Sequence, residues 1–202
     1  MVILIIYQRE KGGGGEGGSP LLETMKILSW NCQGLRNPWM VCSLHKVVRE
    51  QALQICFLME TRLDLDGLNQ WCDDLPFKNR FVVKKPGLGG RLALMWKEDV
   101  NLDVFKFSEH QISTKVTKGD GFQWILIGFY GWPETKEWYK SWALLSYICT
   151  LVDGPWMCIK DFNEILSSIE KLSVRPTLSF QLNAFREALE LYNLVNLGFI
   201  DY

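Results

Sequence analysis

Apolar residues form short runs along this chain, and each run breaks off at a polar or turn-forming residue. The run at 25–31 (MKILSWN) and the run at 54–60 (QICFLME) each predict a buried strand that ends on a polar side chain. Between them, residues 36–53 predict a helix: Asn37 suits the N-cap, Pro38 suits the first helical position, and apolar residues recur on one face.

The middle of the chain has a β pattern, and helical patterns lie on both sides of it. Turn residues separate its apolar runs, and the KGDG sequence at 118–121 predicts a tight hairpin. Strands and helices interleave around this antiparallel stretch, which predicts an α/β sandwich with mixed sheets and not a doubly wound parallel fold. The further predicted helices cover 65–75, 134–153 and 179–194, and the further predicted strands cover 80–85, 91–97, 100–107, 111–117, 122–130 and 156–159.

The first 24 residues differ in composition from the rest. The opening MVILIIYQRE has six apolar residues in a row, too few to cross a membrane, and it lacks the basic start and cleavage site of a signal peptide. The glycine-rich KGGGGEGGSP that follows is typical of a flexible linker. We therefore predict a flexible segment at 1–24 and a domain at 25–202, with no membrane association.

Composition restricts the possible functions only a little. The net charge of the 202 residues is -1, so any contact with nucleic acid must depend on a local patch and not on the overall field. The six cysteines show no C-x-x-C spacing and there are two histidines, which disfavours a zinc site. Free cysteines of this kind favour an intracellular, reducing location.

Polar side chains with metal-binding oxygens stand where three predicted strands end. Asn31 and Glu60 close the first two strands, and Asp161 and Asn163 follow the last one. A carboxylate with an amide oxygen suits Mg²⁺ better than zinc, and a second carboxylate could accept a proton from an attacking water. Taken singly, each residue could equally be a turn former, a helix cap or part of a solvated loop.

Five segments raise the weight of the catalytic interpretation. Together and in this order they resemble the endonuclease/exonuclease/phosphatase superfamily, and most of all the endonuclease domain of plant LINE-type (non-LTR) retrotransposons. The resemblance covers about residues 25 to 202 and implies a four-layered α/β sandwich of the DNase I-like type, with two mixed sheets flanked by helices and an incomplete second sheet. The segments are ILSWNCQGL, ICFLMETR, GGRLALMWK, GFYGWPE and DFNEIL.

The resemblance assigns a role to each candidate residue. It implies that Asn31 and Glu60 bind Mg²⁺, or Mn²⁺ in its place, and that Tyr130 contacts the scissile phosphate. It implies that Asp161 orients or deprotonates the attacking water and that Asn163 binds a phosphate oxygen. The function implied is Mg-dependent hydrolysis of DNA by a retrotransposon-derived endonuclease, nuclear in location and followed by a reverse transcriptase domain in a full-length element.

Departures from the family pattern leave an alternative open. The family's later aspartate and Ser-Asp-His sequence are not found before Tyr202, so we expect a C-terminally truncated domain with impaired activity. The two histidines, His45 and His110, are interpreted as surface or structural residues. Lys160 stands where the family has glycine, which is typical of a drifted copy. The alternative is therefore an inactive retroelement remnant that binds nucleic acid weakly at most.

Other features are ambiguous. A host enzyme of the same superfamily that acts on inositol phosphates or RNA ends is disfavoured by the plant-element wording of the segments. The glycine-rich 86–90 is interpreted as a turn, and Trp132 could stack on a base or pack against its own fold. A basic cluster could follow a DNA backbone or form a solvated sheet edge; it comprises Lys78, Arg80, Lys84, Lys85 and Lys97.

Overall fold

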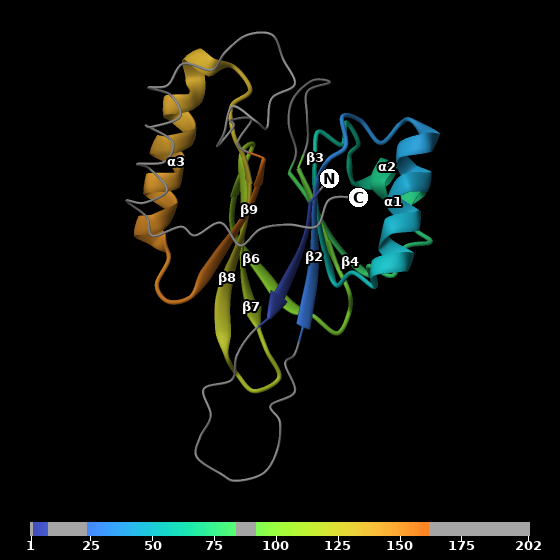
Figure 1. Cartoon of the computed structure of the whole chain (residues 1–202), viewed down its shortest axis with the longest axis horizontal. Helices are drawn as coiled ribbons and strands as arrows, with labels where there is room; N and C mark the ends of the chain where they lie inside the picture. The colour runs from blue at the N-terminus through green and yellow to red at the C-terminus, as the bar shows by residue number, and fades with distance from the viewer. Residues whose placement is uncertain (1, 8–23, 84–91, 162–202) are drawn as a thin grey trace. The chain divides into compact units, whose positions relative to one another are not determined.

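The computed structural model describes residues 2–7, 24–83 and 92–161, which fall into two compact units (Figure 1). The first unit includes the described residues up to Asn101, and the second begins at Leu102. Each unit contains one sheet.

The first unit contains a five-stranded sheet in the order β1-β2-β3-β5-β4. β2 and β3 are parallel and are joined by helix α1, while the other neighbouring strands are antiparallel, so the sheet is mixed. The elements of this unit are β1 (Val2–Tyr7), β2 (Thr24–Asn31), α1 (Pro38–Gln51), β3 (Ile55–Met59), α2 (Leu65–Cys72), β4 (Asn79–Val82) and β5 (Ala93–Trp96).

Strand β1 lies in the stretch for which the composition predicts a flexible segment. It pairs with β2 from Val2↔Ser29 to Tyr7↔Thr24. Apolar, mostly β-branched residues favour strands, and the edge of β2 offers unpaired backbone groups for them to bind. The expectation that all of 1–24 stays outside the fold is therefore wrong for Val2–Tyr7, while residues 8–23 lie outside the described part and the domain limits stay a prediction.

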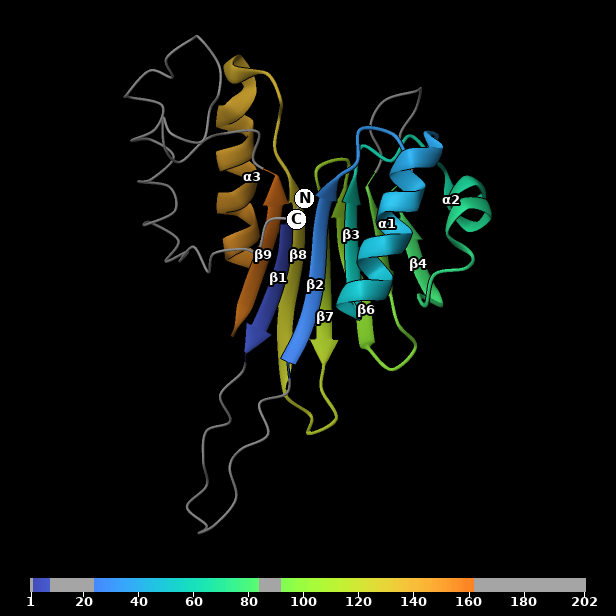
Figure 2. The ribbon, with the colours of Figure 1, turned by 45° about the vertical axis from the view of Figure 1, so that its right-hand side comes forward.

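Helix α1 begins as the sequence predicts. The side chain of Asn37 accepts a hydrogen bond from the backbone nitrogen of Trp39 at 3.0 Å, and Pro38 occupies the first turn. α1 and α2 cover one face of the sheet (Figure 2). Their buried residues Leu44, Val48 and Leu68 belong to the same apolar cluster as residues of β2, β3 and β5.

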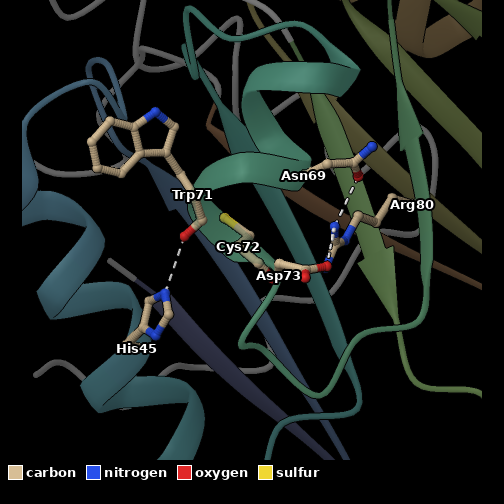
Figure 3. Close-up of polar contacts among 6 residues, drawn as sticks. All are labelled: His45, Asn69, Trp71, Cys72, Asp73 and Arg80. Carbon is tan, nitrogen blue, oxygen red and sulfur yellow. Dashed lines mark hydrogen bonds and ion pairs between the residues drawn. The ribbon is translucent and has the colours of Figure 1, made fainter.

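The guanidinium of Arg80 binds the carboxyl end of α2 (Figure 3). It donates to the carbonyl oxygen of Cys72 at 2.7 Å and to the side-chain oxygen of Asn69 at 2.8 Å, and it lies 3.8 Å from the carboxylate of Asp73. A cation at this position satisfies a helix-end carbonyl and opposes the helix dipole. Arg80 therefore has a structural role, which weakens its candidacy as a DNA-backbone contact.

The second unit contains a four-stranded sheet in the order β6-β7-β8-β9. β7 and β8 form the predicted hairpin, whose turn is closed by a 2.9 Å hydrogen bond from Gly121 N to Lys118 O. β8 and β9 are parallel and are joined through α3. The elements are β6 (Asn101–Ser108), β7 (Gln111–Thr117), β8 (Gln123–Tyr130), a 3-10 turn (Thr135–Glu137), α3 (Trp138–Leu151) and β9 (Trp156–Asp161).

Helix α3 packs on one face of the second sheet (Figure 1). Leu145 and Ile148 are almost completely buried against Ile127 and Phe129 of β8. The predicted fold class is confirmed: the chain is α/β, with two mixed sheets flanked by helices. The predicted helix at 179–194 and the turn at 86–90 lie outside the described residues.

No helix within the described ranges has the length and apolar character needed to span a membrane.

Candidate active site

The carboxyl ends of the parallel strands β2 and β3 hold a pair of polar side chains. Asn31 is the last residue of β2 and lies opposite Met59, the last residue of β3, so Glu60 follows directly at the same edge of the sheet. The Nδ2 of Asn31 donates a hydrogen bond to Oε1 of Glu60 at 2.7 Å. Both side chains are half-buried, and the structure thus brings these two predicted site residues together.

The backbone around this pair adopts a conformation that L-residues rarely use. Gln33, Glu60 and Arg62 have φ of 47°, 54° and 55°. Left-handed backbone at residues other than glycine costs free energy and persists only where the surrounding structure holds it. Such strain is typical of functional sites, and here it surrounds the polar pair.

Hydrogen bonds tie the two loops of this edge together. Leu35 N donates to Thr61 O at 3.0 Å, and Cys32 N donates to Met59 O at 3.1 Å. The amide oxygen of Asn31 accepts a longer bond from Gln33 N at 3.3 Å. These contacts help to hold the side chains of Asn31 and Glu60 in place at the edge of the sheet.

Two further residues of this edge were missed by the sequence analysis. Gly34 has φ of +107°, and a Cβ at this position would lie 3.2 Å from Cδ of Arg62. The exposed Arg62 therefore lays the stem of its side chain along Gly34, two positions after Glu60. The only sign of this contact in the sequence is the arginine of the METR segment. Sequence spacing does not show that Arg62 lies along Gly34.

The oxygens at this edge fit a hard divalent cation. Glu60 supplies a carboxylate and Asn31 an amide oxygen, which are ligand types that Mg²⁺ accepts together with water and phosphate oxygens. In the described part of the chain, no group of three or more His, Cys, Asp and Glu side chains lies close enough to hold a metal ion.

The thiol of Cys32, the residue after Asn31, is buried and kept protonated. Burial, with a smaller contribution from the charge of Glu60, raises the pKa of Cys32 to about 12, while backbone hydrogen bonds oppose the change. The thiol donates to Met59 O at 3.0 Å.

The second sheet has a comparable edge where β8 and β9 end. Tyr130 and Asp161 are the last residues of these parallel strands and lie opposite each other in the register, so the structure places them side by side along the backbone. Lys160 precedes Asp161 and lies opposite Phe129. Asn163 lies outside the described residues, so its assigned role stays a prediction.

The sequence predicts that His110 is a surface or structural residue on a strand, and the structure places it in the turn between β6 and β7. Its Nδ1 lies 3.0 Å from the carbonyl oxygen of Tyr130. Its ring stacks on Trp132, with centroids 3.5 Å apart and planes inclined by 14°. Trp132 therefore packs against its own fold, at the edge where Tyr130 stands.

The pairs Asn31–Glu60 and Tyr130–Asp161 each belong to one unit. The convergence of both pairs on a single ion and its water stays a prediction.

Solved structures with a similar fold come from several kinds of enzyme. The catalytic domain of human Nocturnin, with a bound sulfate anion, aligns with a TM-score of 0.55 and 13% identity over 70% of this chain and 64% of that one. The endonuclease domain of TRAS1, a telomere-specific non-LTR retrotransposon, aligns with a TM-score of 0.61 and 12% identity over 83% and 72%. An endonuclease/exonuclease/phosphatase family protein from Bacteroides thetaiotaomicron aligns with a TM-score of 0.52 and 15% identity over 69% and 62%.

These similarities establish the fold, which is that of endonuclease/exonuclease/phosphatase proteins. The chain spans less than two thirds of the Nocturnin and Bacteroides chains. No protein-family model and no curated protein sequence matches the chain.

Proposed function

We propose that this chain hydrolyses phosphodiester bonds of DNA and depends on Mg²⁺, or on Mn²⁺ in its place. The observation that carries the proposal is the 2.7 Å contact between Asn31 and Glu60 at the ends of two parallel strands. The positive φ of Gln33, Glu60 and Arg62 around this pair is strain of the kind that clusters at functional sites. The fold is shared with a phosphatase and an endonuclease domain, which supports hydrolysis of a phosphate ester.

The first edge would hold the cation through the carboxylate of Glu60 and the amide oxygen of Asn31. When bound there, the cation supplies positive charge that neutralises the phosphate. The hydrogen bond from Asn31 keeps the carboxylate of Glu60 in one orientation before any ligand arrives.

The second edge would supply the groups that act on the water and the phosphate. Asp161 accepts a proton from the attacking water, whose oxygen forms a bond to phosphorus as the bond from phosphorus to the leaving sugar oxygen breaks. The leaving oxygen then takes up a proton from solvent. Tyr130 donates a hydrogen bond to a non-bridging phosphate oxygen, and Asn163 binds another one.

The biological setting proposed is a retrotransposon of the plant LINE type. The TRAS1 domain, a non-LTR retrotransposon endonuclease, is among the proteins of similar fold, and the segments of this chain resemble those of plant elements. Such an endonuclease acts on DNA in the nucleus, and a reverse transcriptase domain follows it in the full-length element.

A second candidate is a chain that keeps the fold but does not cut. Lys160 favours it, because this residue places a long cationic side chain directly before Asp161, where the resemblance expects glycine. A positive charge at this position disfavours a metal cation near Asp161, because like charges repel. This candidate binds nucleic acid weakly and has no hydrolytic step.

Nicking of supercoiled plasmid in Mg²⁺ and in Mn²⁺ tests the two candidates. We expect the chain to nick, EDTA to stop it, and Glu60→Gln or Asp161→Asn to lower the rate by about 100-fold or more. The matched controls Glu50→Gln, on the exposed face of α1, and Asp153→Asn, in the exposed loop before β9, should keep the rate.

Absence of nicking by the unaltered chain in both metals would overturn the proposal, and DNA binding without cleavage would then support the second candidate. Cleavage that persists in Glu60→Gln would show that the first edge is not the metal site. A further expectation is that Lys160→Gly raises the rate, and an unchanged or lower rate would remove the interpretation of Lys160 as a drifted residue.

A further inference from the structure

His110 occupies the turn that precedes β7, beside the carboxyl end of β8. β7 begins at Gln111, which lies opposite Phe129, so the turn and the end of β8 are at the same edge of the second sheet. Ser108 holds the turn, because its hydroxyl oxygen accepts a hydrogen bond from His110 N at 3.2 Å. A histidine from a distant part of the sequence thus lies next to Tyr130.

Two hydrogen bonds join His110 and Tyr130 in both directions. Tyr130 N donates to the carbonyl oxygen of His110 at 2.8 Å, and Nδ1 of the imidazole lies 3.0 Å from the carbonyl oxygen of Tyr130. A carbonyl oxygen only accepts, so Nδ1 must carry the hydrogen of this bond. The bond therefore fixes the tautomer of the neutral ring, with the hydrogen on Nδ1 and the lone pair on Nε2.

The residues that follow Tyr130 are held from two sides. The ring of His110 stacks on Trp132 at 3.5 Å, and the backbone nitrogen of Trp132 donates to the hydroxyl of Ser141 at 3.0 Å. Ser141 is fully buried on α3. The segment from Tyr130 to Trp132 is thus fixed between the β6–β7 turn and α3, with the imidazole as one of the two supports.

Charged groups also lie near the imidazole. The hydrogen bond from Lys140 lowers the pKa of Glu137, and the charges of Lys140, Lys136 and His110 act in the same direction. Glu137 precedes α3 and Glu109 precedes His110 in the turn. The carboxylate of Glu137, at the start of the helix, is therefore close enough to interact with the ring, while Nδ1 of the ring faces the backbone of β8.

We propose that His110 is a positioning residue that acts through Tyr130. Its Nδ1–H bond and its stacked face fix the end of β8, and thereby hold Tyr130 beside Asp161, its partner in the strand register. Its effect on cleavage rests on the proposed function, whereas the tautomer and the stacking do not. It does not touch the phosphate in this scheme, so it is not a catalytic residue.

Histidine NMR tests the geometry without reference to activity. The chain has two histidines. Long-range ¹H–¹⁵N NMR spectra, recorded at a pH where both imidazoles are neutral, report the tautomer of each. We expect Nδ1–H for His110 and Nε2–H for His45, because Nε2 of His45 lies 3.2 Å from the carbonyl oxygen of Trp71. The Nε2–H tautomer at His110 would overturn the proposal.

The NMR signals of the Tyr130 ring report the position of this residue. They are assigned by their loss in Tyr130→Phe. We expect His110→Phe, which keeps a stacking face but has no donor, to shift or broaden these signals. His110→Asn, whose amide nitrogen stands near the place of Nδ1 but which has no ring to stack, should broaden these signals less than His110→Phe does. Unchanged Tyr130 signals in His110→Phe would overturn the proposal even if the chain does not cleave DNA.

Kinetics then separate positioning from a merely structural role. We expect His110→Phe to lower kcat by about tenfold or more with KM little changed, because small misplacements of a reacting group are costly. His110→Asn should recover part of the loss, and the control His45→Phe should keep the rate. The double variant His110→Phe/Tyr130→Phe should be no slower than Tyr130→Phe alone.

Additive losses in the double variant would show that His110 acts independently of Tyr130, and would overturn the proposal. If the unaltered chain does not nick DNA, the proposed function fails, while the tautomer and the Tyr130 signals still decide whether His110 positions this strand end.

Discussion

The two sheets each contain one strand–helix–strand unit with parallel strands, and their carboxyl edges differ in how polar residues are held. In the first unit, β2 ends on Asn31 and Glu60 directly follows β3, and the side chains of these two residues bind each other directly. In the second unit β8, α3 and β9 end on Tyr130 and Asp161, which are related through the backbone register. The same local topology thus presents two different kinds of site.

The difference is clearest in the backbone. Among the described residues other than glycine, those with positive φ are Gln33, Ala52, Glu60 and Arg62, and only Ala52 lies away from the first edge. The second edge is held instead by stacked rings and by His110 and Ser141. A strained backbone that the surrounding structure holds in place is suited to keeping a pair of ligands fixed. Ring stacking is suited to placing the end of one strand.

Of the predicted changes, alkaline pH should lower the free energy of unfolding most, because the first unit buries thiols. Burial raises the pKa of Cys32 to about 12, of Cys72 to about 11 and of Cys56 well above its usual value. A thiol that stays neutral in the fold but ionises near pH 9 when unfolded contributes stability that is complete below that pH. This stability is lost as pH rises from about 9 toward 12, by about 1.4 kcal/mol per pH unit and thiol.

Urea unfolding at a series of pH values from 8 to 11 measures this loss. Cys72→Ala should lower the pH dependence by one thiol, while Cys42→Ser, on the exposed side of α1, should leave it unchanged. Iodoacetamide should label Cys42 well before the buried thiols of the first unit. Equal pH dependence in Cys72→Ala and the unaltered chain would contradict this prediction.

Alanine substitutions at three glycines distinguish the strain of the first edge from the cost of ordinary turn geometry. Gly34 has positive φ and a close neighbour, Gly121 has φ of +83° in open space, and Gly119 has nothing within 4 Å and no positive φ. We expect alanine to cost about 3, 1 and 0 kcal/mol of unfolding free energy at these positions in turn. Urea denaturation measures each value, and equal losses at Gly34 and Gly121 would show that the contact with Arg62 contributes nothing.

Arg80 tests how the helices of the two units are anchored. It binds the carboxyl end of α2, whereas α3 has no basic residue in its last turn and depends on its buried apolar face. Arg80→Ala should lower the unfolding free energy by about 2 kcal/mol, since charged hydrogen bonds are lost at a largely buried position. Arg80→Lys should recover little, because lysine lacks the planar fork.

The exposed Lys78→Ala is the control for Arg80, and it should have no measurable effect on urea unfolding. Full stability of Arg80→Lys would mean that charge alone, and not the paired hydrogen bonds to Asn69 and Cys72, stabilises the end of α2.

The smallest effect is expected on the outer face of α1. Lys46 and Glu50 are 4.0 Å apart and both are well exposed. Lys46→Ala should change the unfolding free energy by less than about 0.5 kcal/mol, because exposed ion pairs are screened by water and salt. A loss above about 1 kcal/mol would show that this face is covered by another part of the protein.

Local patterns determined most of the secondary structure. Asn37 and Pro38 start α1 where the sequence predicts, and the strands that end on Asn31 and Glu60 are found within a residue or two of their predicted limits. These features depend on neighbours a few residues apart. β1 was missed, because its pairing with β2 is a contact across the glycine-rich segment that no local pattern reports.

For this protein the sequence by itself determined which residue types stand at the strand ends, because a run of apolar side chains and its polar stop are properties of a few consecutive residues. Only the tertiary structure decided which of them meet. Asn31 touches Glu60 across 29 positions, Arg62 lies along Gly34, and His110 supports Tyr130 from another turn. Such contacts depend on strand pairing and on backbone held in rare conformations, which many segments must form together.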